Sequence, residues 1–371
     1  MSERTPELLY SEPEEDLRTA VRSLLADALD PAALIRATEG PDGPYDPRLW
    51  RLLGAEMGLA GLLVPEKLGG AGASHREAAV VLEELGRRVA PLPFLTSSVV
   101  AAEVLLACDT GADAVAGLLG PLAGGARTVA LAVPWSASPH GPVPRVSVAG
   151  DRLTGTVTSV ADGAGADVWL VPAADGLYTV ERGTDGASAE AMTPLDLTRP
   201  LARLTLVDAA GLRLADAATA DAAVARGLLA GAGLLASEQL GLAEWCLTET
   251  VDYLKQRRQF ARQVGGFQAL KHRLAQLWLQ LVAARAAARG AADALAAGAP
   301  DAAVSVAVAA SYASETAVRA AEEAVQLHGG IGMTWEHPVH LYLKRAKSSQ
   351  LALGTPGAHR AALASLVDLP A

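Results

Sequence analysis

The sequence predicts a mostly α protein with a central β domain. We expect an N-terminal helical domain at 1–121, a middle β domain at 122–214 and a C-terminal four-helix bundle at 215–371. Hydrophobic residues make up 51% of the 371 residues, and most of this excess is Ala and Leu, which are strong helix formers. Short β-branched segments are concentrated in the middle of the chain. A chain of this length can form more than one domain around a large buried core.

The N-terminal domain shows helical spacing from Ser11 to about Gly120. Pro13 and the three acidic residues that follow it are typical of a first helical turn, where the helix dipole favours negative charge. Apolar residues then recur at helical spacing from Leu17 to Leu25. These patterns predict a helix that begins near Ser11.

A glycine-rich loop, GGAG at 69–72, lies inside the same domain. A phosphate-binding P-loop would need a Lys followed by Ser or Thr, and no such pair follows here, so we predict a tight turn. The next helix begins near His75. Pro91 and Pro93 are expected to end it before Phe94.

The middle region, from about Leu122 to Leu214, changes to short strand-like segments. RTVALAVPW, RLTGTVTSV and ARLTLVDA are β-branched and are separated by Gly, Pro and Asp. This alternation of short strands with turn residues predicts a small antiparallel sheet or barrel.

The C-terminal region returns to helical spacing in long, Ala-rich pieces. We predict helices over 222–254, 266–297 and 302–327, and a last helix after Pro356. Alanine faces let helix axes approach closely, so long helices joined by short loops favour a four-helix-bundle-like domain.

Composition excludes several classes of protein. No apolar run free of charges is long enough to span a bilayer, and residues 1–13 are acidic and polar, so neither a signal peptide nor a membrane span is expected. Cys108 and Cys246 lie far apart and match no metal spacing, which fits a reducing cytoplasm. The formal net charge of −10 argues against nucleic acid as the main partner.

One stretch, 322–347, organises the C-terminal region. A helical run there ends at two adjacent glycines, Gly329 and Gly330, whose backbone can adopt positive φ and approach another body closely. Gln326 and His328 bring polar side chains to the same edge. The pattern indicates a place where a ligand's polar groups lie against main chain. A helix C-cap glycine followed by an ordinary loop is the alternative.

This stretch resembles the C-terminal signature of the acyl-CoA dehydrogenase family, flavoproteins that oxidise the α,β bond of acyl-CoA thioesters. The resemblance implies that Gln326, Gly329 and Gly330 receive the adenosine diphosphate part of a FAD bound mainly by a neighbouring subunit. TWEH and LYLKRA, which follow, resemble an actinobacterial branch of the family. VPEKLGG and EELGR near the N-terminus are also similar to the family, so the resemblance covers nearly the whole chain.

A second motif, YLKQRRQFARQVGGFQ at 253–268, contains two adjacent arginines. A guanidinium presents parallel donors that suit a pyrophosphate, although two arginines alone are by default a solvated face that complements a helix C-terminus. The motif resembles the family element in which an Arg and a Gln contact FAD across a subunit interface. The resemblance assigns cofactor binding to Arg257, Phe260 and Gln268, whereas Arg258 occupies a variable position.

The chain departs from the family pattern around the flavin ring. Residues 133–135 read VPW where the family has a Thr-Glu-Pro segment, and Ser159 and Ala161 stand where an aromatic residue and a Thr usually lie beside the ring. Ala261 replaces a Gly in the Arg motif. The usual ring-binding groups are therefore expected to be largely missing.

Both positions at which the family carries its catalytic base are also changed. Abstraction of an α-proton from a thioester needs a carboxylate shielded from water. The commonest family position precedes a Gly-Thr pair and holds Leu353 here. The second precedes an Arg at the first long C-terminal helix and holds Ala225, before Arg226. We therefore predict no catalytic residue in this chain.

The remaining carboxylates and histidines that could act as a base or bind a metal are not expected to do so. Glu238, Glu244 and Glu336 are conceivable substitute bases, but we expect them to be structural or surface carboxylates. His337 and His340 are three residues apart without a third ligand at a suitable spacing, so no metal site is expected.

The histidine and the basic residues near the glycine motif are not expected to be catalytic. His328 is expected to play a structural or cofactor-edge role. The basic run of Lys344, Arg345 and Lys347 is interpreted as a solvated or interface face.

These observations predict an FAD-dependent acyl-CoA dehydrogenase subunit that lacks the base. Its partners would be a bulky acyl-CoA, by analogy a sterol side chain or polyketide-like thioester, an electron-transfer flavoprotein or similar acceptor, and a homologous subunit that carries the catalytic Glu in a heterotetramer. A homo-oligomer is the other possible assembly. Two alternatives remain: a self-sufficient homo-oligomeric flavoenzyme with a non-standard base, and a non-enzymatic acyl-CoA-binding or scaffold protein without flavin.

Overall fold

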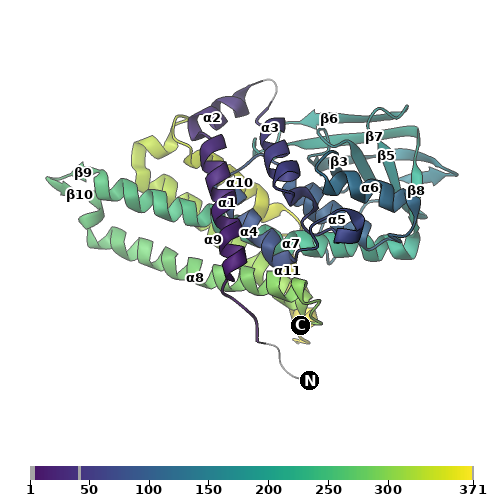
Figure 1. The fold of residues 1–371 in the computed structure, drawn as a ribbon. Helices are drawn as coiled ribbons and strands as arrows, with labels where there is room; N and C mark the ends of the chain where they lie inside the picture. The colour runs from purple at the N-terminus through teal and green to yellow at the C-terminus, as the bar shows by residue number, and fades with distance from the viewer. Residues whose placement is uncertain (1–4, 41–42, 370–371) are drawn as a thin grey trace.

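The structure is a computed structural model that describes residues 5–40 and 43–369. Helices come first, two small sheets follow, and helices continue to the C-terminal end (Figure 1). This order confirms the predicted fold class. The predicted boundary after 121 falls within α6 (Asp113–Ala123), and the one after 214 falls within β8 (Leu212–Asp216), so the exact domain limits stay predictions.

The N-terminal part begins with a capped helix, α1. The Ser11 amide and hydroxyl both donate to Glu14 Oε2, at 2.6 and 2.7 Å, which forms a capping box and agrees with the predicted acidic first turn. α4 ends at Arg87, and Pro91 and Pro93 lie in the break before the next helix. The helices of this part are α1 (Glu12–Ala28), α2 (Pro31–Glu39), α3 (Pro47–Trp50), η1 (Arg51–Glu56), η2 (Leu59–Gly61), η3 (Glu66–Leu68), α4 (His75–Arg87), η4 (Phe94–Ala101), α5 (Ala102–Leu106) and α6.

The middle part consists of two four-stranded sheets, in the orders β1-β4-β5-β8 and β2-β3-β7-β6. Neighbouring strands pair antiparallel, except β1 with β4, which are parallel. The predicted antiparallel sheet is therefore right for all pairs but this one. The other strands are β1 (Val129–Leu131), β2 (Ser147–Ala149), β3 (Arg152–Ala161), β4 (Val168–Ala173), β5 (Gly176–Glu181), β6 (Ala187–Met192) and β7 (Leu201–Ala210).

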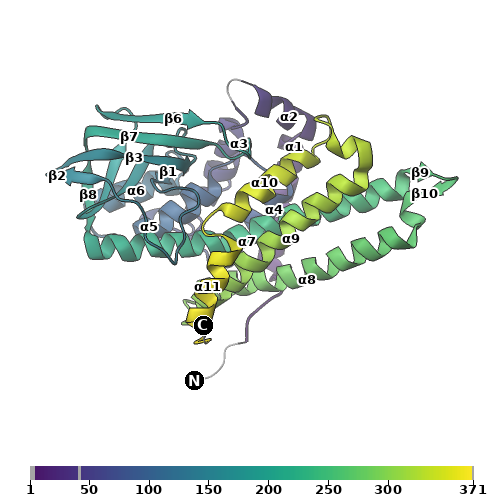
Figure 2. The same ribbon diagram turned by 180° about the vertical axis from the view of Figure 1, so that it is seen from behind.

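The C-terminal part contains the four predicted helices and one more. α7, α8, α9 and α11 occupy the predicted ranges, and α10 follows the glycine motif. Figure 2 shows α10 and α11 crossing the outside of the long helices. The elements are α7 (Ala217–Gln256), β9 (Arg258–Gln259), β10 (Arg262–Gln263), η5 (Val264–Gly266), α8 (Gln268–Ala296), α9 (Ala302–His328), η6 (Gly329–Met333), α10 (Val339–Leu351) and α11 (Pro356–Leu366).

The interpretation of 344–347 as a solvated run is wrong for Arg345, which is 1% exposed. Its guanidinium forms ion pairs with Asp196 and with Glu238, the latter at 2.8 Å, and donates to Thr198. A buried guanidinium is tolerated because these acceptors replace water. Lys344 is only half-buried, and its ammonium lies 4.0 Å from the centre of the Trp335 ring.

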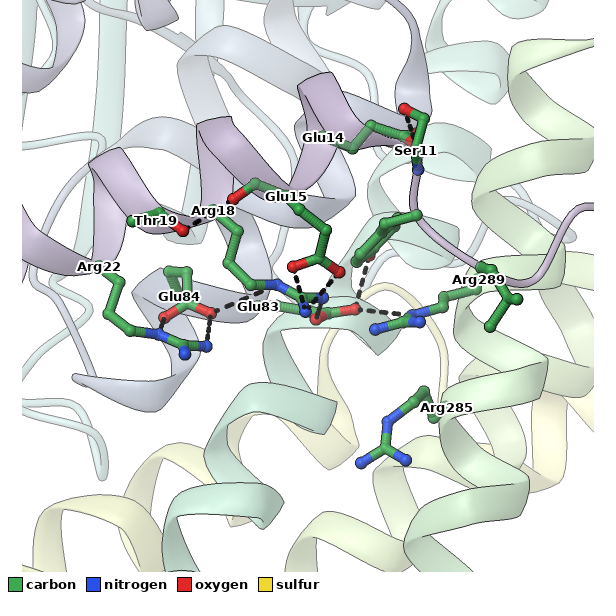
Figure 3. Close-up of polar contacts among 12 residues, drawn as sticks. Ser11, Glu14, Glu15, Arg18, Thr19, Arg22, Glu83, Glu84, Arg285 and Arg289 are labelled. Carbon is green, nitrogen blue, oxygen red and sulfur yellow. Dashed lines mark hydrogen bonds and ion pairs between the residues drawn. The ribbon is translucent and has the colours of Figure 1, made fainter.

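A set of hydrogen bonds and a close helix crossing join the N-terminal helices to the bundle. Glu83 on α4 accepts hydrogen bonds from the Tyr10 hydroxyl at 2.6 Å and from Arg18 of α1 at 2.9 Å, and it lies 3.5 Å from Nε of Arg289 on α8 (Figure 3). α4 and α7 also cross in backbone contact, since a Cβ on Gly86 or Gly241 would lie within 2 Å of a carbonyl oxygen of the other helix. The N-terminal helices and the bundle are therefore one packed body.

α7 has the length and apolar composition of a membrane-crossing helix. In its most apolar window, however, 61% of the residues are buried inside the protein, where α7 packs against α4, α8 and α9. These contacts are those of a core helix. The prediction of no membrane span was based on charge-free runs and did not single out this helix.

Candidate functional site

The six residues predicted to bind a cofactor belong to two turns at one end of the C-terminal bundle, which we call the open end. The β9–β10 hairpin projects from this end, and the sheets lie at the opposite end of the molecule (Figure 1). α8 leads away from the hairpin and α9 returns antiparallel to it, so the glycine turn that ends α9 comes back to the same end. The open end is defined by Arg257, Phe260, Gln268, Gln326, Gly329 and Gly330.

The hairpin places Arg257 and Gln268 on either side of a tight turn. α7 ends because Arg257 adopts an extended conformation, with its amide still bonded to the Tyr253 carbonyl. Phe260 and Ala261 form the two-residue turn, at φ of 51° and 59°. Positive φ at both positions is typical of a type I′ hairpin turn, which usually contains Asn-Gly. The Ala at 261 therefore retains the turn at some cost in backbone strain.

The polar side chains of the open end are exposed and available. Within 5–40 and 43–369, the side chains of Arg257 and Gln326 make no hydrogen bond or ion pair. The amide of Gln268 has one polar neighbour, His272, at 3.5 Å. Phe260 is 85% exposed and meets the ring of Phe267 edge-on. Such an exposed aromatic beside unpaired donors is typical of a binding surface.

The glycine turn contains two glycines that the fold requires and one that could be replaced without a steric clash. Gly329 has φ of +64°, and a Cβ on Gly332 would lie 2.6 Å from the Val325 carbonyl oxygen. Gly330 has neither constraint: a Cβ there would meet nothing within 4 Å. An unconstrained Gly is consistent with the close approach of another molecule to its backbone.

His328 connects the two turns of the open end. Its ring stacks on Tyr253 of α7 with centroids 4.5 Å apart, and its Nδ1 lies 2.7 Å from the Ala324 carbonyl oxygen. It is 2% exposed, so of the two roles expected from the sequence, structural or cofactor-edge, its burial is consistent with the structural one. His337, rather than His340, lies beside it, with ring centroids 4.4 Å apart.

Residues from the changed flavin-ring positions and from the commoner base position meet at a second place, which we call the filled cleft. Trp135, Ala161 and Leu353 line it, and only about 20 Å³ of free volume remains between them. The Leu353 amide donates to the Trp135 carbonyl at 2.8 Å, and the Trp135 amide donates to the Ser159 carbonyl at 2.8 Å. The indole of Trp135 lies under the Arg199 guanidinium, 5.0 Å from the ring centre.

Ala225, the second expected base position, lies at the mouth of the filled cleft. It lines an open cavity of about 340 Å³ together with Ser138 and Val224. Leu228 borders both this cavity and the filled cleft. An ion pair between Arg145 and Asp221 forms part of the rim. The outer cavity therefore contains no carboxylate at the family position.

The three conceivable substitute bases are poorly suited to proton abstraction. Glu238 is 2% exposed and is paired with Arg199 at 2.6 Å and with Arg345. Burial raises the pKa of Glu238, but the two guanidinium groups outweigh this effect and lower it overall. Glu244 is held in the same way by Arg87 and Arg285, and Glu336 is exposed. A carboxylate fixed between two arginines has little basicity.

Sequence patterns did not reveal the buried polar cluster behind the filled cleft. Asp196 and Arg199 come from the segment between β6 and β7, whereas Glu238 and Arg345 come from α7 and α10. No short motif links these segments, so only the folded chain brings the four residues together.

Comparison with known proteins agrees with this architecture. Residues 11–112 match the family described as "Acyl-CoA dehydrogenase, N-terminal domain", and residues 221–367 match "Acyl-CoA dehydrogenase, C-terminal domain". The chain is 41% identical over 340 residues to "Acyl-CoA dehydrogenase IpdE2" of Mycobacterium tuberculosis, with 92% of each chain covered. The chain therefore belongs to the acyl-CoA dehydrogenase family, whose members are oxidoreductases acting on CH–CH groups.

Two solved structures resemble the chain over nearly its full length. One is the ChsE4–ChsE5 complex from Mycobacterium tuberculosis, at a TM-score of 0.85 and 29% identity, covering 98% of this chain and 100% of that one. The other is a variant of the Tcur3481–Tcur3483 steroid ACAD, at a TM-score of 0.83 and 31% identity, covering 96% and 98%.

The two regions differ in how well they fit FAD, which the family generally binds. The open end offers an unpaired guanidinium, two exposed amides and an unconstrained glycine, which suit a diphosphate and its sugar. The filled cleft does not fit a flavin ring, because ligand pockets usually measure about 300–1,000 Å³. Its free volume of about 20 Å³ is far below that range.

Proposed function

We propose that this chain is a subunit of an FAD-dependent acyl-CoA dehydrogenase that completes a partner's flavin site and supplies no catalytic base. The observation that carries this proposal is the contrast between the filled cleft and the open end. The ring half of the chain's own site holds Trp135 and Leu353, while the half that would face another subunit's cofactor remains exposed.

The roles of the open-end residues follow from their chemistry. Arg257 would bind the diphosphate through parallel N–H donors, and the amides of Gln268 and Gln326 would orient the adenosine part. Gly330 would let the backbone approach without a Cβ in the way. When bound, FAD supplies the acceptor for the hydride that leaves the acyl-CoA. Because the base positions hold Leu353 and Ala225, the α-proton would be taken by a carboxylate of the partner subunit.

The partner is proposed to be a homologous chain that carries the Glu this chain lacks. Similarity to the ChsE4–ChsE5 complex and to a steroid ACAD supports a hetero-oligomer acting on a bulky, sterol-like acyl-CoA. An electron-transfer flavoprotein or similar acceptor would reoxidise the flavin, and the reaction would take place in the cytoplasm.

The self-sufficient enzyme is disfavoured by the geometry of its possible bases. Glu238 and Glu244 are each fixed by two arginines, and Glu336 is exposed. A non-enzymatic acyl-CoA-binding role has one observation in its favour, the open cavity of about 340 Å³ beside Ala225. That cavity has room for part of an acyl chain, and the carboxylate in its lining, Asp221, is paired with Arg145.

Flavin stoichiometry separates these functions. The purified chain and the chain co-expressed with a homologous subunit that carries a Glu at a family base position would be compared by flavin absorbance. Little flavin on the isolated chain and about one per pair in the complex is expected. One flavin per isolated chain would contradict the subunit proposal, and a colourless complex would favour the acyl-CoA-binding alternative.

A further inference from the structure

A cluster of three metal-ligating side chains lies at the glycine turn, outside the residues assigned to the cofactor. Glu249 comes from α7, His328 is the last residue of α9, and His337 lies just before α10. One ligand atom from each of these residues lies within 4.8 Å of the other two. The sequence did not suggest this set, since its residues are far apart in the chain.

His328 has the arrangement of a metal ligand. Its Nδ1 lies 2.7 Å from the Ala324 carbonyl oxygen, so Nδ1 carries the proton and donates to that oxygen. Nε2 is then left with its lone pair. This atom is buried and has no hydrogen-bond partner within the described residues, although the residue is only 2% exposed. A histidine whose other ring nitrogen donates to a carbonyl is the usual arrangement around a protein-bound metal.

His337 completes the pair of imidazoles. Its ring is half-buried and lies beside that of His328, with the ring centroids 4.4 Å apart. Its Nδ1 accepts one hydrogen bond, from the Val339 amide at 3.3 Å. Metal binding would break this long contact, because Nδ1 either becomes the ligand atom or takes the proton released from Nε2.

Glu249 supplies the charge of the set. It is not buried, so its side chain can turn toward the imidazoles without unpacking the core. A tetrahedral ion with bonds of about 2.0–2.1 Å needs ligand atoms about 3.3 Å apart. The three groups therefore need to close by only a short distance from their present positions.

We propose that Glu249, His328 and His337 bind a divalent transition-metal ion, with Zn²⁺ as the ion that best fits two imidazoles and a carboxylate. The fourth position would be left to water or to another ligand. The ion would join α7, the end of α9 and the segment before α10, and so fix the backbone of the glycine turn from Gly329 to Gly332. The proposal does not depend on the flavin function, because none of its ligands is among the open-end residues.

The test is a metal titration of the full-length chain without added flavin. After dialysis against a chelator, ZnCl₂ would be added while binding heat and melting temperature are recorded, with MgCl₂ as the control ion. CoCl₂ would report on geometry, since tetrahedral Co²⁺ absorbs strongly in the visible. Saturable binding near one Zn²⁺ per chain, a Zn²⁺-dependent rise in melting temperature and a visible Co²⁺ spectrum are expected.

Variants assign the binding to these residues. His337→Ala and Glu249→Gln are each expected to weaken Zn²⁺ binding by at least about 10-fold, because even outer partners of a metal contribute that much. His340→Ala, a nearby histidine outside the cluster, should bind Zn²⁺ as the native chain does. His328→Ala is avoided because this ring is buried in the fold.

Two results would overturn the proposal. One is the absence of saturable Zn²⁺ binding. The other is equal binding by the native chain and both ligand variants, which would identify an adventitious ion only. Neither result bears on the flavin proposal, which is tested by stoichiometry in the mixed complex.

Discussion

The open end and the filled cleft are the two parts of this chain that we propose to correspond to the two halves of a flavin site, and they have opposite physical character. At the open end, the polar side chains are exposed, and within the described residues those of Arg257 and Gln326 make no hydrogen bond or ion pair. The backbone around them is strained or unconstrained. In the filled cleft, apolar side chains occupy the space, and behind them the buried carboxylate of Glu238 is paired with Arg199 and Arg345. The first region is arranged for binding and the second for stability.

This difference teaches that the two halves of such a site can change independently. In a symmetric flavoenzyme of this family, the resemblance implies that each FAD lies between subunits. One chain can then lose the ring half while keeping the half that faces its neighbour. Apolar filling of the lost half stabilises the fold, whereas an exposed group such as Arg257 contributes little to stability, which fits the binding role proposed for it.

The largest expected effect comes from Glu238→Gln, which removes the ion pairs of this buried carboxylate behind the filled cleft. This change leaves Arg199 without its ion-pair partner and Arg345 with Asp196 only. Removing one partner of a buried ion pair destabilises by about 3–5 kcal/mol. Chemical denaturation would measure the loss, with exposed Glu336→Gln as the control, expected to stay within about 0.5 kcal/mol. Loss of turnover in the mixed complex without loss of stability would instead identify Glu238 as a base.

The same residue gives a dependence on pH. The pKa of Glu238 is lowered in the fold, so its ionised form stabilises the protein above the unfolded pKa of about 4.3. That contribution is lost as pH falls through the lower folded pKa, where the fold must release the pairing or protonate the carboxylate. The native chain should therefore lose stability more steeply than Glu238→Gln below about pH 4.3. Parallel slopes would show that the buried cluster does not titrate with unfolding.

At the open end, Arg257→Ala should change binding rather than folding. A charge-assisted hydrogen bond contributes about 1.5–3 kcal/mol, so the FAD dissociation constant of the mixed complex should rise roughly 10- to 150-fold. The melting temperature of the isolated chain should not change, because Arg257 is exposed. Arg258→Ala is the matched control on the same hairpin. An equal loss of FAD affinity in the two variants would mean that the arginines act only as a general basic surface.

The glycine turn allows the contrast to be tested within four residues. Gly332→Ala places a Cβ 2.6 Å from the Val325 carbonyl oxygen, and such overpacking typically costs about 1–3 kcal/mol. Gly330→Ala meets no atom and should leave stability within about 0.5 kcal/mol. Flavin affinity of the mixed complex should nevertheless fall in Gly330→Ala. An unchanged affinity would mean that no ligand approaches this backbone.

The sequence predicted the elements whose signals are local. The acidic first turn of the helix that begins near Ser11, the helix-ending prolines and the periodic C-terminal helices all depend on residues close together in the chain. The burial of Arg345 could not be predicted in this way. Its acceptors Asp196 and Glu238 are 149 and 107 residues away, so the run of basic residues gave the wrong interpretation.

For the candidate site, too, the sequence predicted local changes but not contacts between distant segments. The family pattern identified Leu353 and Ala225 as changed positions, but not that Leu353 and Trp135 hydrogen-bond across the cleft and fill it. Likewise, the sequence spacing pairs His337 with His340, which is three residues away. The structure places His337 beside His328 instead, because the glycine turn folds one segment back on the other.

The smallest effect concerns the strain of the hairpin that carries Arg257. Ala261 adopts φ of 59°, and the left-handed conformation costs a non-glycine residue about 1–2 kcal/mol. Ala261→Gly removes this strain but adds flexibility to the unfolded chain, which offsets about 0.4–1 kcal/mol. A net stabilisation of about 0.5 kcal/mol is therefore expected from chemical denaturation.

Ala269→Gly is the matched control for this change. It lies in the exposed first turn of α8, where the backbone is helical, so the same substitution should destabilise by about 0.5–1 kcal/mol. Opposite signs for the two variants would locate the strain in the turn itself. Destabilisation by both would mean that Ala261 is not strained, and that the open end differs from the filled cleft in exposure alone.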